Sequence, residues 1–121
     1  DFDGISNTDA IVANVNSSDG YFTQYPWSAA GICKDYIFQN GKRGYLGAAG
    51  EWNLVQGSIK AINTLLDAIG ERIETSLYDS SNYWSSTQYD GTRVWCQHFR
   101  YGYGDIYNKK NRRCIRPFCS L

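Results

Sequence analysis

The sequence predicts an α+β fold in a single domain, with two to three helices early in the chain and a twisted antiparallel sheet late. Two patterns lead to this class. Apolar residues recur at helical spacing between residues 27 and 69, and from residue 83 onward they alternate with period two. The 121 residues, of which 42% are hydrophobic, fit one small core, so residues 1–121 are treated as one domain.

The first twenty residues are polar, with Asp, Asn and Ser clusters around the short apolar run Ala10–Ala13. We expect an irregular N-terminal segment over residues 1–20 that holds at most one short element. Residues 1–4 have the composition of the middle of a calcium loop. However, Ala10 stands where the bidentate Glu would be needed, which favours a solvated turn over a metal site.

Pro26 predicts the start of a first helix, because its fixed φ suits the first helical turn. The helix is expected over residues 27–36, followed by a turn at Asn40-Gly41. The residues at i, i+3, i+4 and i+7 spacing, which predict its core face, are Ala29, Ile32, Cys33 and Tyr36.

The stretch from about Ala48 to Ile69 is the most helical region and follows a short extended segment at residues 44–47. We expect two consecutive helices, with the second starting near Ser58 and ending at the cap residue Gly70. The predicted core face of the second helix consists of Ile59, Ile62, Leu66 and Ile69, with Leu65 beside them.

Strand patterns begin at residues 83–87 and return at residues 93–101 and 113–118, where Pro117 predicts an edge. In the middle strand, Trp95, Gln97, Phe99 and Tyr101 share one side. Val94, Cys96, His98 and Arg100 share the other. If Trp95 and Phe99 point inward, Cys96, His98 and Arg100 face solvent together.

The charge pattern argues against a dedicated nucleic-acid binder, because twelve basic and twelve acidic residues give a net charge of zero. The charge is divided along the chain, with a net −5 over residues 1–89 and a net +5 over residues 90–121. No segment has the roughly 20 apolar residues that a membrane span needs. The chain opens without Met or a signal peptide, which we interpret as a mature form or an excised domain.

Catalytic motifs are not recognisable. His98 is the only histidine and shares a strand face with Cys96, but nothing orients its imidazole and no oxyanion cradle follows. Cys96 and His98 give at most two zinc ligands, and phosphate-binding and dinucleotide glycine motifs are absent. The carboxylates Glu51, Glu71 and Glu74 have no distinctive spacing. We therefore expect no enzyme activity, no metal and no cofactor.

The section from Tyr89 to Arg113 mixes Tyr, Arg, Asp and Asn side chains, a composition typical of paratopes and interface hot spots. Composition alone fits a polar loop beside a Tyr-rich sheet equally well. The alternation of the middle strand favours a displayed binding face.

Several segments resemble bacterial C-type-lectin-like domains. Residues 27–33 are similar to the first helix of these domains, which carries a Cys. Residues 44–52 are similar to their G-[YW]-x-L-P-[ST]-x-x-E-L segment, although Gly47 and Ala48 replace Pro and Ser here. The match continues over residues 83–87 (Y-W-S-S-T) and 113–116 (R-C-I-R), and it spans roughly residues 27–118. Within this group the chain most resembles the variable proteins of diversity-generating retroelements.

That resemblance implies a display domain whose sheet, over residues 83–118, carries positions diversified through template adenines. Fixed positions would include Trp95, Gln97, Phe99, Gly102 and Lys109. A template Asn codon mutated at its adenines never gives Lys, Gln, Glu, Met or Trp, and every proposed varied position obeys this rule. The positions that the resemblance implies to be varied and ligand-binding are Asp90, Arg93, Cys96, His98, Arg100, Tyr101, Tyr103, Asp105, Ile106, Tyr107 and Asn108.

The implied function is non-enzymatic binding of a protein or glycan on a cell surface, from an extracellular position on a bacterium or a phage virion. Multivalent or oligomeric display would fit this function. A preference for acidic partners would follow from the basic C-terminal part. Two alternatives are a calcium-dependent carbohydrate-binding lectin, whose ligand triplets are missing here, and a relative of formylglycine-generating enzymes, which are longer and need a reactive Cys.

Four Cys residues in a short chain fit an oxidising compartment. In the resembling domains the first-helix Cys pairs with the last-strand Cys, which implies a disulfide between Cys33 and Cys114. In the chain-entropy model, such a loop of about 80 residues stabilises by roughly 4 kcal/mol. Cys96 is expected at the surface and Cys119 free or bound to the tail. The alternative is that all four thiols are reduced.

Overall fold

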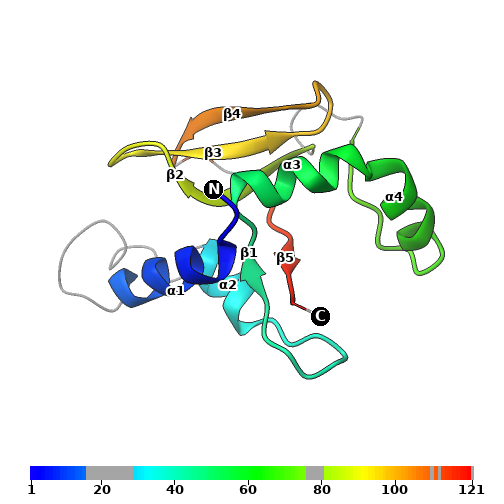
Figure 1. The fold of residues 1–121 in the computed structure, drawn as a ribbon, viewed down its shortest axis with the longest axis horizontal. Coiled ribbons are helices and arrows are strands. Elements are labelled where there is room, and N and C mark those ends of the chain that lie inside the picture. Colours follow the sequence, from blue (N-terminus) through cyan, green and yellow to red (C-terminus); the bar gives the residue numbers. More distant parts are fainter. Residues whose placement is uncertain (16–28, 76–80, 110, 112, 121) are drawn as a thin grey trace.

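The computed structural model describes residues 1–15, 29–75, 81–109, 111 and 113–120, and within them the fold is α+β with antiparallel sheets. Figure 1 shows the helices in the first half of the chain and the main sheet in the second. The elements are α1 (Gly4–Val15), α2 (Ala29–Asp35), β1 (Tyr45–Leu46), α3 (Ala49–Gly57), α4 (Ile59–Asp67), β2 (Asn82–Gln88), β3 (Arg93–His98), β4 (Tyr103–Asn108) and β5 (Pro117–Phe118).

The main sheet has the order β2-β3-β4, and both pairs are antiparallel. β1 and β5 form a separate two-stranded antiparallel ribbon. The strand that follows α2 therefore lies beside the last strand of the chain. Cys114 adds a parallel bridge to Tyr83 at the outer side of β2. The expected late antiparallel sheet is therefore confirmed, and Pro117 lies in a short edge strand as predicted.

The prediction of an irregular segment over residues 1–20 is wrong for its first part, because α1 is a twelve-residue helix. Its start is fixed by the Asp3 carboxylate, which accepts a hydrogen bond from the Ser6 backbone N–H at 3.0 Å and has its pKa lowered by that bond. Thr8, 1% exposed, joins the helix to β1 by accepting from the Leu46 N–H at 2.9 Å. The bond to Thr8 is tertiary, and neither contact leaves a periodic apolar signal in the sequence.

Helix α2 ends one residue earlier than predicted, and its buried face is rotated. Ala30 and Cys33 are buried, whereas Ile32 and Tyr36 are 44% and 52% exposed. The helix ends at Asp35, so Tyr36 lies outside it and the core needs only one i, i+3 pair. The expected start at Pro26 lies outside the described residues.

The predicted division into two consecutive helices is confirmed, with the break at Ser58 between α3 and α4. Ile59, Ile62 and Leu66 pack on the core as expected. Leu65 and Ile69 do not, since they are 76% and 70% exposed. Ile69 follows the last helical residue, and Gly70 beyond it adopts the left-handed conformation (φ +72°) expected of a cap residue.

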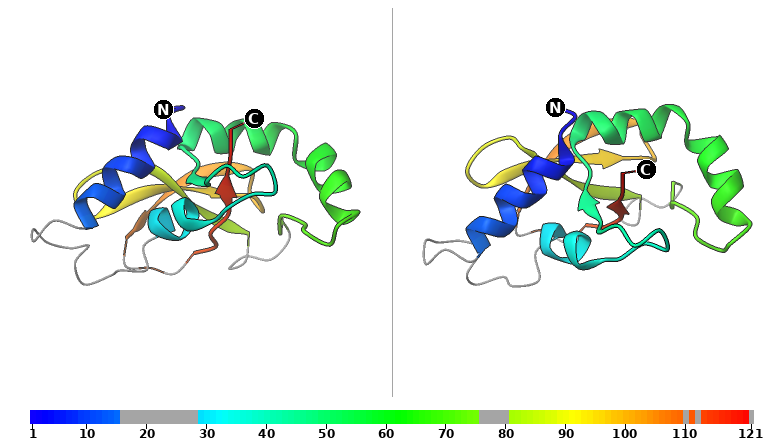
Figure 2. Two further views of the ribbon diagram at one scale, coloured as in Figure 1. Left: turned by 90° about the horizontal axis from the view of Figure 1, so that it is seen from below. Right: turned by 60° about the horizontal axis from the view of Figure 1, so that its bottom comes forward.

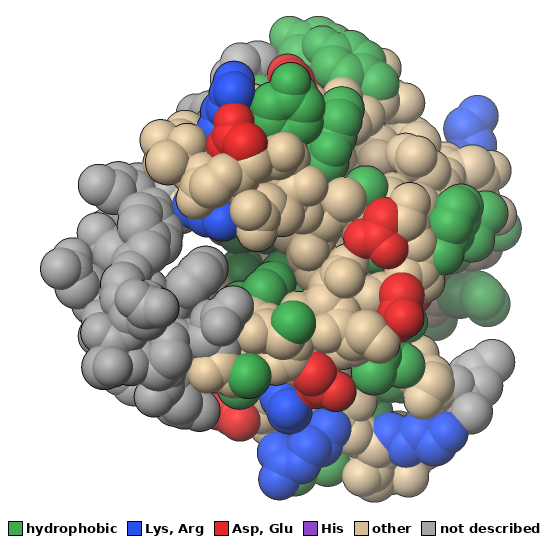
Figure 3. Space-filling view, turned by 60° about the vertical axis from the view of Figure 1, so that its left-hand side comes forward, with side chains coloured by type: hydrophobic (Ala, Val, Ile, Leu, Met, Phe, Trp, Pro, Cys, Tyr) green, Lys and Arg blue, Asp and Glu red, His purple; other side chains and the backbone are tan. Residues whose placement is uncertain are grey.

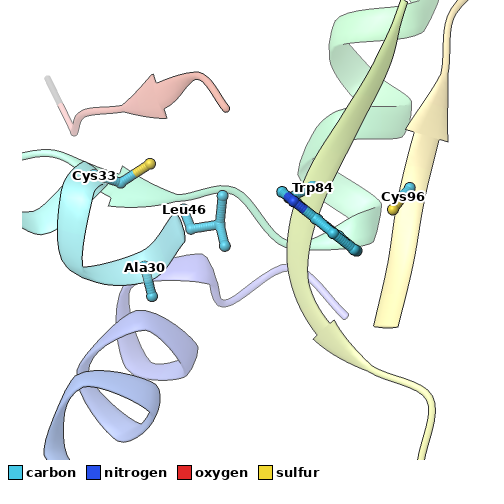
Figure 4. Close-up of a cluster of buried hydrophobic side chains, with 5 residues drawn as sticks. All are labelled: Ala30, Cys33, Leu46, Trp84 and Cys96. Carbon is cyan, nitrogen blue, oxygen red and sulfur yellow. The ribbon is translucent and has the colours of Figure 1, made fainter. Parts of the chain in front are cut away.

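Two hydrophobic clusters cover the two faces of the main sheet. One gathers Trp84 and Cys96 of the sheet with Ala30, Cys33 and Leu46 (Figure 4). The other gathers the aromatic side chains Trp52, Tyr83, Phe99 and Phe118 below α3 and α4. In the left view of Figure 2, the three strands pass between α3 on one side and α2 on the other. Both faces of the sheet are thus partly covered by other elements.

Candidate binding surface

The predicted outward face of β3 is not a solvent face. Cys96 and His98 are 2% and 1% exposed, so these two sequence-predicted binding positions are corrected to buried ones. Figure 4 shows Trp84 between Leu46 and Cys96. The period-two alternation itself is present, but it identifies two faces without saying which meets solvent. Here helices or loops lie over both of them.

The other predicted positions reach the surface to different degrees. Arg100, the third member of the predicted outward group, is exposed. The stretch from Tyr101 to Tyr107 is exposed or half-buried throughout. The exposed positions are Arg93, Arg100, Tyr101, Tyr103 and Asn108, and the half-buried ones are Asp90, Asp105, Ile106 and Tyr107.

Three of the exposed side chains meet at the turn between β3 and β4, and with His98 they form what we name the hairpin-tip cluster. The Tyr101 and Tyr103 rings stack with centroids 5.9 Å apart and planes at 15°, and each is about half exposed. The buried His98 ring lies 4.7 Å from that of Tyr101. The Arg100 guanidinium lies 5.8 Å from the Tyr101 centroid.

The backbone holds this cluster in a tight turn. Gly102 has φ +75°, a left-handed conformation that side chains rarely adopt, and its N–H donates to the His98 carbonyl at 2.9 Å. The buried imidazole lies against the two exposed aromatic rings.

A second cluster lies at the other end of β3, where Asp90 organises the β2–β3 turn. One carboxylate oxygen accepts from the Thr92 and Arg93 backbone N–H groups, and the other from the Arg93 Nε at 2.8 Å. The hydrogen bond from Arg93 is the main reason why the pKa of Asp90 is lowered to about 2. Arg93 also lies 4.9 Å from the Tyr89 ring centroid, and that ring meets Trp95 edge-on.

The remaining predicted positions line β4. The Tyr107 ring carries the Arg113 guanidinium at 4.1 Å from its centroid. Asp105 accepts from the Ile106 N–H at 2.8 Å and from the Tyr107 hydroxyl at 3.4 Å. These side chains are half-buried, whereas Tyr101 and Tyr103 are exposed.

The predicted disulfide between Cys33 and Cys114 is wrong in this structure, because Cys33 is a free and fully buried thiol. The two residues belong to different hydrophobic clusters. Burial raises the pKa of Cys33 to about 12 and also raises that of Cys96, which keeps both thiols protonated and unreactive near neutral pH. Cys119 is a free, half-buried thiol, as expected.

The described residues contain no group of three or more His, Cys, Asp or Glu side chains arranged to hold a metal ion. None of the helices in the described ranges is long and apolar enough to cross a bilayer.

Charged groups are interspersed on the face shown in Figure 3. Basic side chains gather mainly along its lower edge, and acidic ones lie nearer the middle and beside some of the basic groups. No single sign of charge dominates this view.

The sequence patterns did not reveal three polar residues whose hydrogen bonds join separate elements of the fold. Glu51 accepts hydrogen bonds from the Gly4 and Ala48 N–H groups and from the Tyr45 hydroxyl at 2.7 Å, so it joins α1, β1 and α3. Asn63 forms a buried pair of hydrogen bonds with the Ile73 backbone. Glu at N3 of a helix is a readable capping signal, although Ala48 lacks the usual N-cap oxygen. Thr8 and Asn63 gave no such signal.

Comparison of the chain with protein-family models, curated proteins and solved structures gives no match.

Proposed function

We propose that this chain is a non-enzymatic display domain with a C-type-lectin-like fold that binds a protein or glycan on a cell surface. The hairpin-tip cluster is the observation that carries the proposal. Two stacked, half-exposed tyrosines and an exposed arginine stand on a turn that a buried histidine and a left-handed glycine hold in place. Tyr and Arg are the residue types enriched in binding hot spots.

The stacking of the Tyr101 and Tyr103 rings supports this use of the cluster. Aromatic side chains that are stacked before binding lose little conformational entropy when a partner covers them. The raised pKa values of the Cys33, Cys96 and Cys114 thiols disfavour thiolate chemistry and so support a role without catalysis. A patch of this kind is smaller than the roughly 800 Å² per partner of a standard interface, which favours multivalent display.

The proposal includes diversification of this surface by a retroelement. Nine of the eleven positions expected to vary reach the surface, and the buried Cys96 and His98 leave the set. The test is genomic: a reverse transcriptase nearby, with a near-copy of codons 83–118 that differs mainly at adenines. A neighbourhood without such a copy contradicts diversification but leaves binding at the hairpin tip standing. Extracellular placement on a bacterium or virion belongs to the same proposal.

The binding test uses a tetravalent fusion of the domain on arrays of glycans and of bacterial surface proteins. Tyr101→Ala combined with Tyr103→Ala should weaken any array signal by at least about 30-fold, the effect of losing a hot spot. Tyr36→Ala is the matched control, because Tyr36 is 52% exposed, as Tyr103 is, and directly follows α2, outside the hairpin-tip cluster. An unchanged signal in the double variant, or a signal lost equally in the control, contradicts the proposal.

A further inference from the structure

A groove of about 370 Å³ opens between the start of α3, residues 1–2 and the main sheet. It is separate from the hairpin-tip cluster. Gly104 pairs with Gln97 in the register and Tyr103 pairs with His98, so the groove residues Gln97 and Gly104 lie on the opposite face of the sheet from Tyr103. The proposed display function does not use this groove.

The indole of Trp95 provides the flat wall of the groove. Tyr89 meets it edge-on at 5.9 Å and fixes its plane. On the neighbouring strand, a Cβ at Gly104 would lie 3.5 Å from Cε3 and 3.9 Å from Cζ3 of the indole. Because Gly104 has no side chain, the six-membered ring of Trp95 stays uncovered at that point.

Polar groups stand around this aromatic wall. Gln97 is 2% exposed and donates from its Nε2 to Gln56 at 3.1 Å, and its Oε1 accepts no hydrogen bond from the described residues. Asn53 is exposed on α3, and its carboxamide makes no hydrogen bond within the described ranges. Among the described lining residues, Asp1 supplies the one charged side chain, and its carboxylate already accepts from Asn7 and Thr87.

We propose that this groove binds a neutral pyranose sugar without a metal ion. The face of an indole is electron-rich and attracts the weakly positive C–H groups on the apolar side of a sugar ring. Carboxamides at the margin can pair with the ring hydroxyls, and none of the lining side chains in the described ranges is basic, which favours a neutral ligand over an acidic one. An apolar wall with a few convergent polar groups is the usual composition of a small-ligand site.

The test follows the indole N–H signals in ¹H–¹⁵N correlation spectra during titration with methyl β-glucopyranoside, methyl β-galactopyranoside and methyl α-mannopyranoside. We expect saturable shifts of one indole signal with at least one of them, at a Kd of about 1 mM, and the same shifts with a chelator present. Shifts with none of the three sugars, shifts that a chelator abolishes, or tighter binding of glucuronic acid or benzyl alcohol would overturn the proposal.

Gly104→Val is the sharpest variant. Gly104 is a strand residue without a positive φ, so a branched side chain fits the backbone but covers the indole, and binding should weaken at least tenfold. Gly91→Val is the matched control, because a Cβ at Gly91 meets nothing within 4 Å and Gly91 lies outside the groove. If Gly104→Val fails to fold, Asn53→Ala on the exposed face of α3 replaces it and should weaken binding severalfold.

Two outcomes separate this site from the display surface. The variant with Tyr101→Ala and Tyr103→Ala should bind the sugar as the unsubstituted chain does, and Gly104→Val should leave partner binding at the hairpin tip intact. Sugar binding that is lost with the two tyrosines, or retained in Gly104→Val, contradicts the groove assignment whatever happens to the display function.

Discussion

At the scale of single residues, the carboxylate of Glu51 joins three elements of the fold. Glu51 accepts from two backbone N–H groups and from the Tyr45 hydroxyl, and each of these donors comes from a different element or its cap. Hydrogen bonds to a charged acceptor are stronger than neutral ones. A polar side chain thus contributes to the packing of α1, β1 and α3 against one another.

Glu51→Ala should lower the free energy of unfolding by about 2–4 kcal/mol, because it removes three hydrogen bonds from partly buried donors. Urea denaturation measures the change. Glu71→Ala is the control, since Glu71 is exposed and its side chain makes no hydrogen bond in the described part of the chain; it should change stability by less than about 0.5 kcal/mol. Equal effects of the two substitutions would show that Glu51 has no special role.

The cysteines give a second prediction at this scale. With a maleimide reagent near neutral pH, Cys119 should react first, because it is half-buried while Cys33 and Cys96 are almost fully buried and their pKa values are raised. Peptide mapping after timed labelling identifies the order. Rapid labelling of Cys33 in the folded protein would contradict its burial in the cluster with Ala30 and Leu46.

At the scale of elements, the sequence patterns predicted which segments form helices and strands better than which side chains they bury. The break at Ser58 agrees with the structure, and so do the first two strand patterns, which correspond to β2 and β3. The sequence patterns did not predict β4, and only Pro117 and Phe118 of the strand expected over residues 113–118 form one. Ile69 and Tyr36 were expected in the core, but each lies just beyond the end of its helix and points to solvent. Periodicity assigns a face to a residue only as long as the helix continues.

The same limit explains the error at the candidate site. Cys96 and His98 do share one face of β3, as the alternation predicted, but the buried cluster around Trp84 and Leu46 covers part of that face. Which face is covered depends on where α1, α2 and β1 pack, and these contacts join residues far apart in the sequence. Tyr101 and Tyr103 were predicted correctly as exposed because they lie at a turn, where packing from other elements ends.

Two buried hydrogen bonds join Asn63 of α4 to the segment that follows the helix. Asn63 donates to the Ile73 carbonyl at 3.0 Å and accepts from the Ile73 N–H at 2.8 Å, both in buried surroundings. Asn63→Ala should therefore cost about 2–3 kcal/mol, since it leaves two buried backbone groups without partners. Asn53→Ala, on the exposed side of α3, is the control and should be close to neutral. Hydrogen exchange should quicken at the Ile73 amide in the first variant alone.

At the scale of the whole molecule, alkaline pH is the condition that should weaken the fold. Burial raises the pKa of Cys33 to about 12 from an ordinary value of 9.0, and it raises the pKa values of Cys96, Tyr45 and Tyr83 as well. These groups come from α2, β3, β1 and β2, so the effect is spread over both clusters and the ribbon. Each is held neutral by the folded state.

The sign follows from linkage between folding and proton binding. Below pH 9 the Cys33 thiol is protonated in both states, and its burial contributes fully. Between pH 9 and about 12 the thiol ionises in the unfolded chain but not in the folded one, so stability falls with rising pH, by up to about 1.4 kcal/mol per pH unit for this group. Urea denaturation at pH 8, 9 and 10 measures the slope.

Cys33→Ala should lower stability at every pH but flatten the slope above pH 9, whereas Cys119→Ala, at a half-buried position, should leave the slope unchanged. A slope that is the same in Cys33→Ala and in the unsubstituted chain would mean that Cys33 ionises with equal ease in both states, which is incompatible with its burial among Ala30, Leu46 and Trp84.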